Sequence, residues 1–365
     1  MKVNSNVLDR QFFMYQNEYE EKALNVLRRG WYVLGNEVLE FEKEFANYVG
    51  AEHCVGLASG LDALWIAFRL LDIKEGDEVI VQSNTYIASI MGITMNGATP
   101  IFVEPDKYHN IDINKIEEKI TDKTKAILVV HLYGQATQMD KVRELCDKHN
   151  LYLVEDCAQS HGAKFNGKNT GTFGDIGCFS FYPSKNLGCF GDGGAIVTNN
   201  DDLARKFRVF RNYGSEKRYH NMVVGTNSRL DELQAGLLRV KLAHLDELNN
   251  ERKKIALNYL SRIKNPYVKL PEIKENCTSV WHLFVICTDY RSKLIEYLNE
   301  NNIGTIIHYP IPPHLSEAYG YLGYKKGNFP IAEHMANTVL TLPLYNGMTE
   351  EEQDYVIEVI NRFEV

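Results

Sequence analysis

An acidic pair and a lysine stand at the ends of two apolar segments in the middle of the chain. The first segment, 151–154, is followed by Glu155 and Asp156, and the second, 176–182, leads past a proline to Lys185. Both segments have the length and composition of buried strands, and open α/β sheets bind ligands at the carboxyl ends of their strands. The sequence therefore predicts that Lys185 and one or both carboxylates face one another across a binding site.

A lysine opposite a carboxylate has a chemical use if the ligand is pyridoxal phosphate. The lysine amine can form a Schiff base with the aldehyde, and a carboxylate beside the pyridine nitrogen keeps that nitrogen protonated, so that the ring withdraws electrons from the substrate. Taken alone, Asp156 is more often a turn-capping acid and Lys185 a solvated loop residue. Their combination with the glycine-rich stretch at 188–194 favours the chemical interpretation.

The segments on either side alternate between strand and helix patterns, which predicts a mostly parallel sheet. Strands are expected at 54–57, 78–82, 100–103, 126–131, 195–198 and 281–286, and helices at 17–29, 36–49, 201–211 and 291–301 and from residues 87, 112 and 139. A long amphipathic helix should begin at Leu230, with Asn227 or Ser228 as its N-cap. The turn at Gly60 and Leu61 precedes a further helix, whose free N–H groups could bind a phosphate.

Two sequence patterns that suggest other chemistry fail on closer inspection. Residues 162–169 nearly spell the phosphate-binding loop of nucleotide triphosphatases, but Asn169 stands where that motif requires a hydroxyl and no helical pattern follows. Asn166 and Gly167 instead predict a tight hairpin turn. The eleven histidines form no HExxH or HxH pair, so the sequence gives no support for a metal site.

Composition limits the class of protein. A length of 365 residues allows a large domain, 1–250, and a smaller one, 251–365. The net charge of -8 and the lack of a long basic run argue against nucleic-acid binding. Seven scattered cysteines without a CxxC pair are typical of a reducing compartment. Because no apolar run approaches the ~20 residues that cross a bilayer and no signal core is found at the amino terminus, we expect a cytoplasmic protein without membrane contact.

The residues around the predicted site resemble a known family. EDCAQSHGA, GCFSFYPSKNLG, GDGGAIVTNN and TNSRLDELQAGLLRVKL are similar to the sugar aminotransferases of the DegT/DnrJ/EryC/StrS family, and the resemblance covers nearly the whole chain. It implies an α/β fold, that of the fold-type I pyridoxal-phosphate aminotransferases. This fold has a large domain with a mostly parallel central sheet and a smaller C-terminal α/β domain. The resemblance further implies a homodimer that acts in deoxysugar biosynthesis for a lipopolysaccharide or another surface polysaccharide.

The resemblance also implies a role for each matching residue. Lys185 would hold the cofactor and serve as the base, and Asp156 would contact the pyridine nitrogen. The other cofactor contacts would come from the backbone amides of Gly60 and Leu61, the Ser180 hydroxyl, the Tyr86 ring, Gln159, and Asn227 reaching across the dimer interface to the partner's cofactor phosphate. His308 and Tyr309 match residues of a lid near the sugar.

The stretch 215–245 narrows the range of expected substrates. It looks most like the family members that aminate carbon 3 of thymidine-diphosphate-linked 3-keto-6-deoxyhexoses, and the expected amino donor is glutamate. Lys217, Tyr219 and Arg229 would supply cations and a hydroxyl at the mouth of the site. A solvated basic loop is the plainer interpretation of these residues. Amination at carbon 4 is the alternative function, and the gluco or galacto configuration stays open. A sister group that carries out dehydration has histidine in place of Lys185, so the lysine argues against it.

Overall fold

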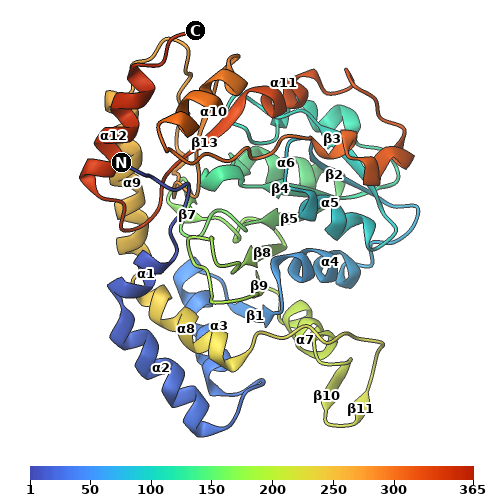
Figure 1. Cartoon of the computed structure of the whole chain (residues 1–365). Coiled ribbons are helices and arrows are strands. Elements are labelled where there is room, and N and C mark those ends of the chain that lie inside the picture. Colours follow the sequence, from blue (N-terminus) through green and yellow to red (C-terminus); the bar gives the residue numbers. More distant parts are fainter.

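The computed structural model describes residues 1–365, with a seven-stranded sheet at its centre (Figure 1). The strands, in the order in which they lie side by side, are β1 (His53–Leu57), β9 (Gly194–Thr198), β8 (Ile176–Ser180), β5 (Tyr152–Asp156), β4 (Thr124–Val130), β2 (Glu78–Gln82) and β3 (Thr99–Val103). Only β9 runs antiparallel to its neighbours, β1 and β8. The prediction of a mostly parallel α/β sheet is therefore confirmed.

Helices cover both faces of the sheet, and this explains why its strands are apolar throughout. Successive strand residues point to opposite faces. Val79 and Val81 pack in the cluster that includes α4 (Gly60–Leu70), α5 (Ile87–Thr94) and α7 (Asp201–Phe210). Ile80 packs on the other face with α6 (Met139–His149), and Val197 packs there with α3 (Asn36–Val49) and α8 (Glu232–Ala243).

Turn and cap residues end the elements where the sequence predicts. Gly30 and Gly50 adopt left-handed conformations, with φ of 68° and 82°, and end α2 (Gln16–Arg29) and α3. Asn166 and Gly167 also have positive φ and join the short strands β6 (Lys164–Phe165) and β7 (Lys168–Asn169). The predicted tight hairpin is confirmed at this position.

The C-terminal part of the chain builds its own apolar cluster around a two-stranded antiparallel sheet. Its elements are α9 (Leu245–Arg262), β12 (Phe284–Cys287), α10 (Arg291–Glu300), α11 (Pro330–Thr338), β13 (Val339–Leu342) and α12 (Glu350–Asn361). Within the C-terminal part, the members of the cluster run from Ile255 to Phe363, and all of these elements except α11 contribute to it. α9 and α12 lie against one another at the left of Figure 1. The division into domains 1–250 and 251–365 stays a prediction, and its boundary lies within α9.

The amino-terminal segment belongs to this C-terminal cluster. Val3 is buried there and forms a parallel bridge with Ile303. Arg10, in α1 (Asp9–Met14), donates to both carboxylate oxygens of Glu352 at 2.6 and 2.7 Å. Bidentate pairs of this kind combine charge with a fixed geometry, so the two ends of the chain are fastened together. No helix combines the length and apolar character needed to cross a membrane.

Several expected element boundaries are wrong. No α-helix begins at residue 112; two 3-10 turns, Ile113–Lys115 and Glu117–Lys119, lie there instead. The strand expected at 176–182 ends at Ser180, and the one expected at 281–286 begins at Phe284. The helix expected from residue 230 begins at Glu232 with Asp231 as its N-cap, so neither Asn227 nor Ser228 caps it. The loop before it contains a hairpin, β10 (Ser215–Lys217) and β11 (His220–Asn221).

Candidate active site

A cavity of about 650 Å³, called the active-site pocket below, lies at the carboxyl ends of β5 and β8. These strands run parallel, so their ends meet at the same edge of the sheet. The N-termini of α4 and α5 form one side of the pocket, and residues 306–309 and 341–344 of the C-terminal part form another. Asp156, Ser180 and Lys185 all line it. The predicted meeting of acid and lysine is therefore observed.

The two adjacent carboxylates at the end of β5 have different surroundings. Asp156 faces the pocket, accepting from the Ser89 hydroxyl at 2.8 Å and the Ala158 N–H at 3.1 Å. Burial raises its pKa, while these hydrogen bonds and the Lys185 ammonium act in the opposite direction. Glu155 is fully buried away from the pocket. Its oxygens accept from the backbone N–H groups of residues 171, 173 and 174 and lie 3.0 Å from Nε2 of His131.

Lys185 lies in the turn that follows β8, where its N–H donates to the Tyr182 carbonyl at 2.8 Å. The next residue, Asn186, ties this turn to distant segments because its side-chain amide donates to Asn249 Oδ1 at 2.8 Å and to the Val280 carbonyl at 2.9 Å. Burial lowers the pKa of Lys185 to about 8. An amine with this pKa can gain or lose a proton near neutral pH, as a general base must.

The N-terminus of α4 forms the end of the pocket that suits a phosphate. Ser59 caps the helix by accepting from the Asp62 N–H at 3.1 Å, and Gly60 and Leu61 line the pocket beside Ser180. A Cβ on Gly60 would lie only 2.5 Å from the Ser180 Cβ, so this approach requires glycine. The free N–H groups and positive dipole end of α4 favour an anion here.

An aromatic wall closes the pocket on the side of α5. The rings of Tyr86 and Tyr309 lie 5.1 Å apart, and Gln159 Nε2 donates to the Tyr309 hydroxyl at 3.1 Å. The Tyr133 N–H in turn donates to Gln159 Oε1 at 2.6 Å. His308 lies 2.7 Å from the Thr341 hydroxyl, and burial lowers its pKa to about 4, so its ring is neutral. All four residues proposed for the ring and the lid therefore share one wall.

Arg252, which the sequence did not indicate, lines the pocket from α9. Its guanidinium donates to the carbonyls of Trp281, His282 and Leu344 at 2.9, 2.7 and 3.2 Å. It is buried and forms no ion pair with an acid. With Lys185 it places two cations in the pocket, whose lining also holds two carboxylates, Asp156 and Asp192. No sequence signal could have found it, because it stands in the charged run Glu251-Arg252-Lys253-Lys254, typical of a solvated helix face.

Four predicted site residues lie outside the active-site pocket of their own chain: Lys217, Tyr219, Asn227 and Arg229. Tyr219 is 83% exposed at the β10–β11 hairpin, which extends from the body of the molecule at the lower right of Figure 1. Arg229 donates to Asn212 Oδ1 at 3.0 Å. The neighbour Ser228 is tied to α4, because its hydroxyl donates to Asp62 Oδ2 at 2.7 Å. The segment that carries Asn227 thus passes the phosphate end of the pocket without entering it.

The groups in the pocket fit pyridoxal phosphate. A lysine amine of lowered pKa and a carboxylate line the same cavity, as an aldehyde and a pyridine nitrogen would require. The helix end at Gly60, where a Cβ would clash, and the Ser180 hydroxyl form a cradle for the phosphate. The half-exposed ring of Tyr86 offers a flat face for the pyridine ring.

Comparison with known proteins agrees with this chemistry. The chain matches the DegT/DnrJ/EryC1/StrS aminotransferase family over residues 14–361. It is 53% identical, over 96% of both chains, to the dTDP-3-amino-3,6-dideoxy-alpha-D-galactopyranose transaminase of Aneurinibacillus thermoaerophilus. The crystal structure of S. venezuelae DesV superposes with a TM-score of 0.97, at 45% identity and covering 99% of this chain and 98% of DesV.

The Bacillus subtilis protein NtdA, solved with the bound cofactor PMP, superposes with a TM-score of 0.92 at 32% identity, covering 98% of this chain and 84% of NtdA. The predicted resemblance, fold class and cofactor are confirmed by these matches. The chain therefore belongs to the DegT/DnrJ/EryC1/StrS family and is a pyridoxal-phosphate-dependent aminotransferase.

Proposed function

We propose that the enzyme transfers an amino group from glutamate to carbon 3 of a thymidine-diphosphate-linked 3-keto-6-deoxyhexose. The observation that carries this proposal is the 53% identity, over 96% of both chains, to a transaminase named for a dTDP-3-amino-3,6-dideoxyhexose. The pocket supports it, because Lys185 and Arg252 are cations that can contact the diphosphate of the substrate or the carboxylates of the donor.

Each side chain of the pocket receives a role in this proposal. Bound pyridoxal phosphate would act as the electron sink that makes the substrate C–H bond acidic. Lys185 would hold the cofactor and, as a free amine, move the proton at Nζ. Asp156, oriented by Ser89 and Ala158, would keep the pyridine nitrogen protonated. The remaining contacts would come from Gly60, Leu61 and Ser180 at the phosphate and from Tyr86, Gln159, His308 and Tyr309 around the ring and the sugar.

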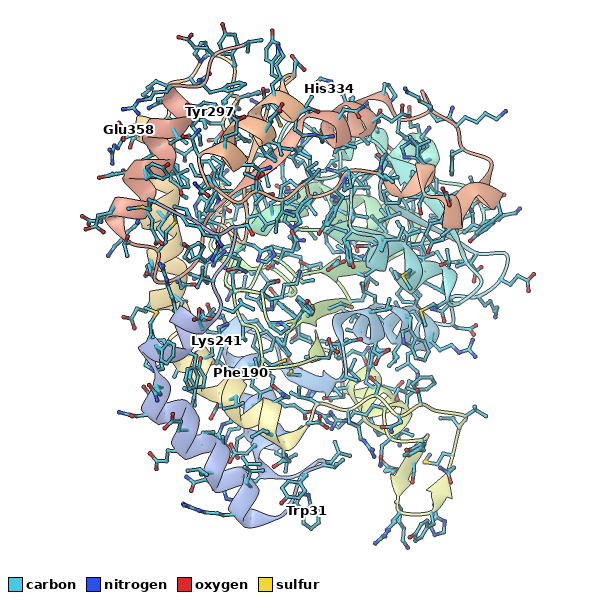
Figure 2. All side chains as sticks on the ribbon, viewed as in Figure 1. Trp31, Phe190, Lys241, Tyr297, His334 and Glu358 are labelled. Atoms are coloured by element: carbon cyan, nitrogen blue, oxygen red, sulfur yellow. The ribbon has the colours of Figure 1, made fainter.

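We further propose a homodimer in which each pocket is completed by the partner subunit. Large apolar side chains are exposed on α1, α2 and the segment leading to α3, among them Phe13 (63%), Leu24 (47%), Leu27 (51%) and Trp31 (65%). Trp31 and the β10–β11 hairpin both lie at the lower end of the molecule (Figures 1 and 2). A patch of this kind is typical of a protein interface. The hairpin would bring Lys217 and Tyr219, and the segment after it Asn227 and Arg229, to the partner's pocket.

The shared site can be tested by complementation. Lys185→Ala and Asn227→Asp should each inactivate a homodimer, the first by removing the amine and the second by placing a carboxylate against the cofactor phosphate. A heterodimer of the two variants should recover activity, because one of its two pockets then receives both native residues. Co-expression with two different affinity tags isolates the heterodimer for assay. No recovery in a verified heterodimer would reject the shared site.

The position of amination is tested with isolated substrates. The enzyme is supplied with glutamate and either a 3-keto or a 4-keto thymidine-diphosphate-linked 6-deoxyhexose, and the new amine is located by NMR. We expect turnover of the 3-keto sugar and a rate at least about 100-fold lower for the 4-keto sugar, since a misplaced reacting carbon costs about that much. Preference for the 4-keto compound would overturn the proposal. The coupling constants of the product assign the gluco or galacto configuration.

A cytoplasmic location is part of the same proposal. All seven cysteines are free thiols, and six of them are buried. Free thiols persist in a reducing compartment. The donor and the nucleotide-linked sugar would both be available there.

A further inference from the structure

A second cavity, called the rear cavity below, shares no lining residue with the active-site pocket. It measures about 550 Å³ and is enclosed by the loop 105–114, the segment 269–274 and α11. His334, labelled in Figure 2, marks its position on α11. None of the residues assigned to the transamination lines this cavity. Its volume is sufficient for a metabolite of ordinary size.

The charges around the rear cavity do not balance. Lys107 pairs with Glu272 at 2.6 Å, and Lys274 pairs with Asp106 at 3.3 Å. The remaining acid of the lining, Asp112, approaches only Lys115, at 4.0 Å, and Lys115 lies outside the cavity.

Two lysines of the lining form no ion pair. Lys141 and Lys269 line the cavity from opposite segments of the chain, and neither forms an ion pair. Across the lining as a whole, four lysines face three carboxylates, so the net formal charge is +1 and an anionic ligand is favoured.

A buried imidazole on the cavity wall also lacks a partner. His109 is only 8% exposed, and its Nδ1 forms no hydrogen bond. Burial lowers the pKa of His109 to about 4, so the ring is neutral and Nδ1 can either donate or accept. A buried polar atom without a partner is costly in a folded protein. Because Nδ1 is closed to solvent, the imidazole contributes to the rear cavity through the rest of its ring.

The wall residue His109 connects the rear cavity with the active-site pocket. Its ring lies 5.3 Å from the ring of Tyr133, and both residues have positive φ, 69° and 60°, which is uncommon outside glycine. Tyr133 holds two residues of the active-site pocket: its N–H donates to Gln159 and its hydroxyl to the His308 carbonyl. A small void lined by His109, Leu132 and Tyr133 lies between the two cavities.

We propose that the rear cavity binds a small organic phosphate monoester, and that this ligand tunes the active-site pocket through Tyr133. A phosphate monoester carries about two negative charges and three acceptor oxygens at neutral pH, which suits the unpaired ammonium groups of Lys141 and Lys269. Lysine is a common phosphate ligand because its ammonium is a compact charge. The apolar side chains of Leu270, Ile331 and Met335 also line the cavity and would contact the organic part of the ligand.

A cysteine provides a local reporter of occupancy. Cys287 lines the rear cavity and is the one cysteine that is not fully buried. Alkylation by iodoacetamide at mildly alkaline pH, followed by mass spectrometry, measures its exposure in the intact holoenzyme. Burial raises the pKa of the Cys287 thiol, which is why an alkaline buffer is needed. Ligand bound in the active-site pocket would not shield this sulfur by contact.

The test compares three proteins: the wild type, the Lys141→Glu/Lys269→Glu variant, and a matched Lys253→Glu/Lys293→Glu control. Lys253 and Lys293 are exposed lysines of α9 and α10 that form no ion pair. Glucose 1-phosphate, thymidine 5′-monophosphate and inorganic phosphate serve as probes, with 2-oxoglutarate as a dianion without phosphate. For each protein, the alkylation rate with probe is divided by the rate without it.

In the wild type and the control, we expect an organic phosphate to slow alkylation of Cys287 at least about threefold and to alter the KM or kcat for amino transfer. In the Lys141→Glu/Lys269→Glu variant, the Kd of the organic phosphate should rise by about 100-fold, since two charge-assisted contacts are lost. Three outcomes would overturn the proposed phosphate site. They are equal protection of Cys287 in all three proteins, protection by 2-oxoglutarate or by inorganic phosphate but not by an organic phosphate, and no protection by any probe. Protection with unchanged kcat and KM would overturn the coupling. Alkylation does not depend on turnover, so an error in the assigned substrate would leave this result intact.

Discussion

Replacement of Lys185 by alanine is expected to lower the rate of amino transfer by about 10⁴-fold or more, since it removes both the covalent attachment point and the base. Lys185 is the only lysine that lines the active-site pocket, so no neighbouring amine can take its place. The fold should survive, because the side chain forms no hydrogen bond within the protein and the turn is held by the Lys185 N–H and by Asn186.

The assignment of Lys185 is checked independently of turnover. Borohydride reduction of the holoenzyme followed by peptide mapping should place a pyridoxyl group on Lys185. The exposed Lys206, replaced by alanine, serves as the control and should leave both labelling and activity unchanged. A label on another lysine, or wild-type turnover by Lys185→Ala, would contradict the assignment.

Two adjacent carboxylates should respond to mutation in opposite ways. Asp156→Asn is expected to reduce kcat by about 10²–10³-fold with little loss of stability, because an amide can keep its contacts with Ser89 and Ala158. Glu155→Gln should instead destabilise the protein by about 2–5 kcal/mol. The glutamine oxygen can replace Oε1, but the NH2 group that replaces Oε2 cannot accept, so the Gly171 N–H and the His131 ring each lose an acceptor in a buried site.

Both carboxylate variants are measured by denaturant unfolding and by kcat per mole of bound cofactor. We expect a loss of kcat in Asp156→Asn and a loss of stability in Glu155→Gln. An inactive Glu155→Gln enzyme of normal stability would show that the roles have been exchanged. Full activity in Asp156→Asn would remove the carboxylate from the mechanism.

The meeting of Asp156 and Lys185 in one pocket could be predicted because its signal is local. A short apolar run followed at once by a polar residue marks the carboxyl end of a buried strand, and parallel strands bring such ends together. The strand pattern alone did not choose between Glu155 and Asp156, and only the family resemblance selected Asp156. Neighbouring strand residues point to opposite faces, but which face holds the ligand depends on loops that are packed from elsewhere, here residues 171–174.

The failed helix prediction at residue 112 has a comparable cause. Ile113 and Ile116 are both buried, at a spacing of three residues. This spacing is shared by the α-helix and the 3-10 helix, which has three residues per turn. The pattern thus indicated which side chains are buried without specifying the helix type.

Arg252 illustrates what no local pattern can indicate. Its burial depends on carbonyl groups of residues 281, 282 and 344, which converge on α9 only after the C-terminal part has folded. An arginine within a charged run is normally solvated. The presence of this arginine in the pocket is accordingly a property of the tertiary structure.

The attachment of the amino-terminal segment has a consequence for biosynthesis on the ribosome. Val3 pairs with Ile303, and Arg10 with Glu352, so the first residues to leave the exit tunnel have partners among the last. Domains usually fold as they emerge, beginning at the amino terminus. Here the central sheet can assemble early, whereas Val3 and Arg10 stay without partners until translation is nearly complete. A nascent chain stalled before residue 303 should therefore leave its first residues open to proteolysis.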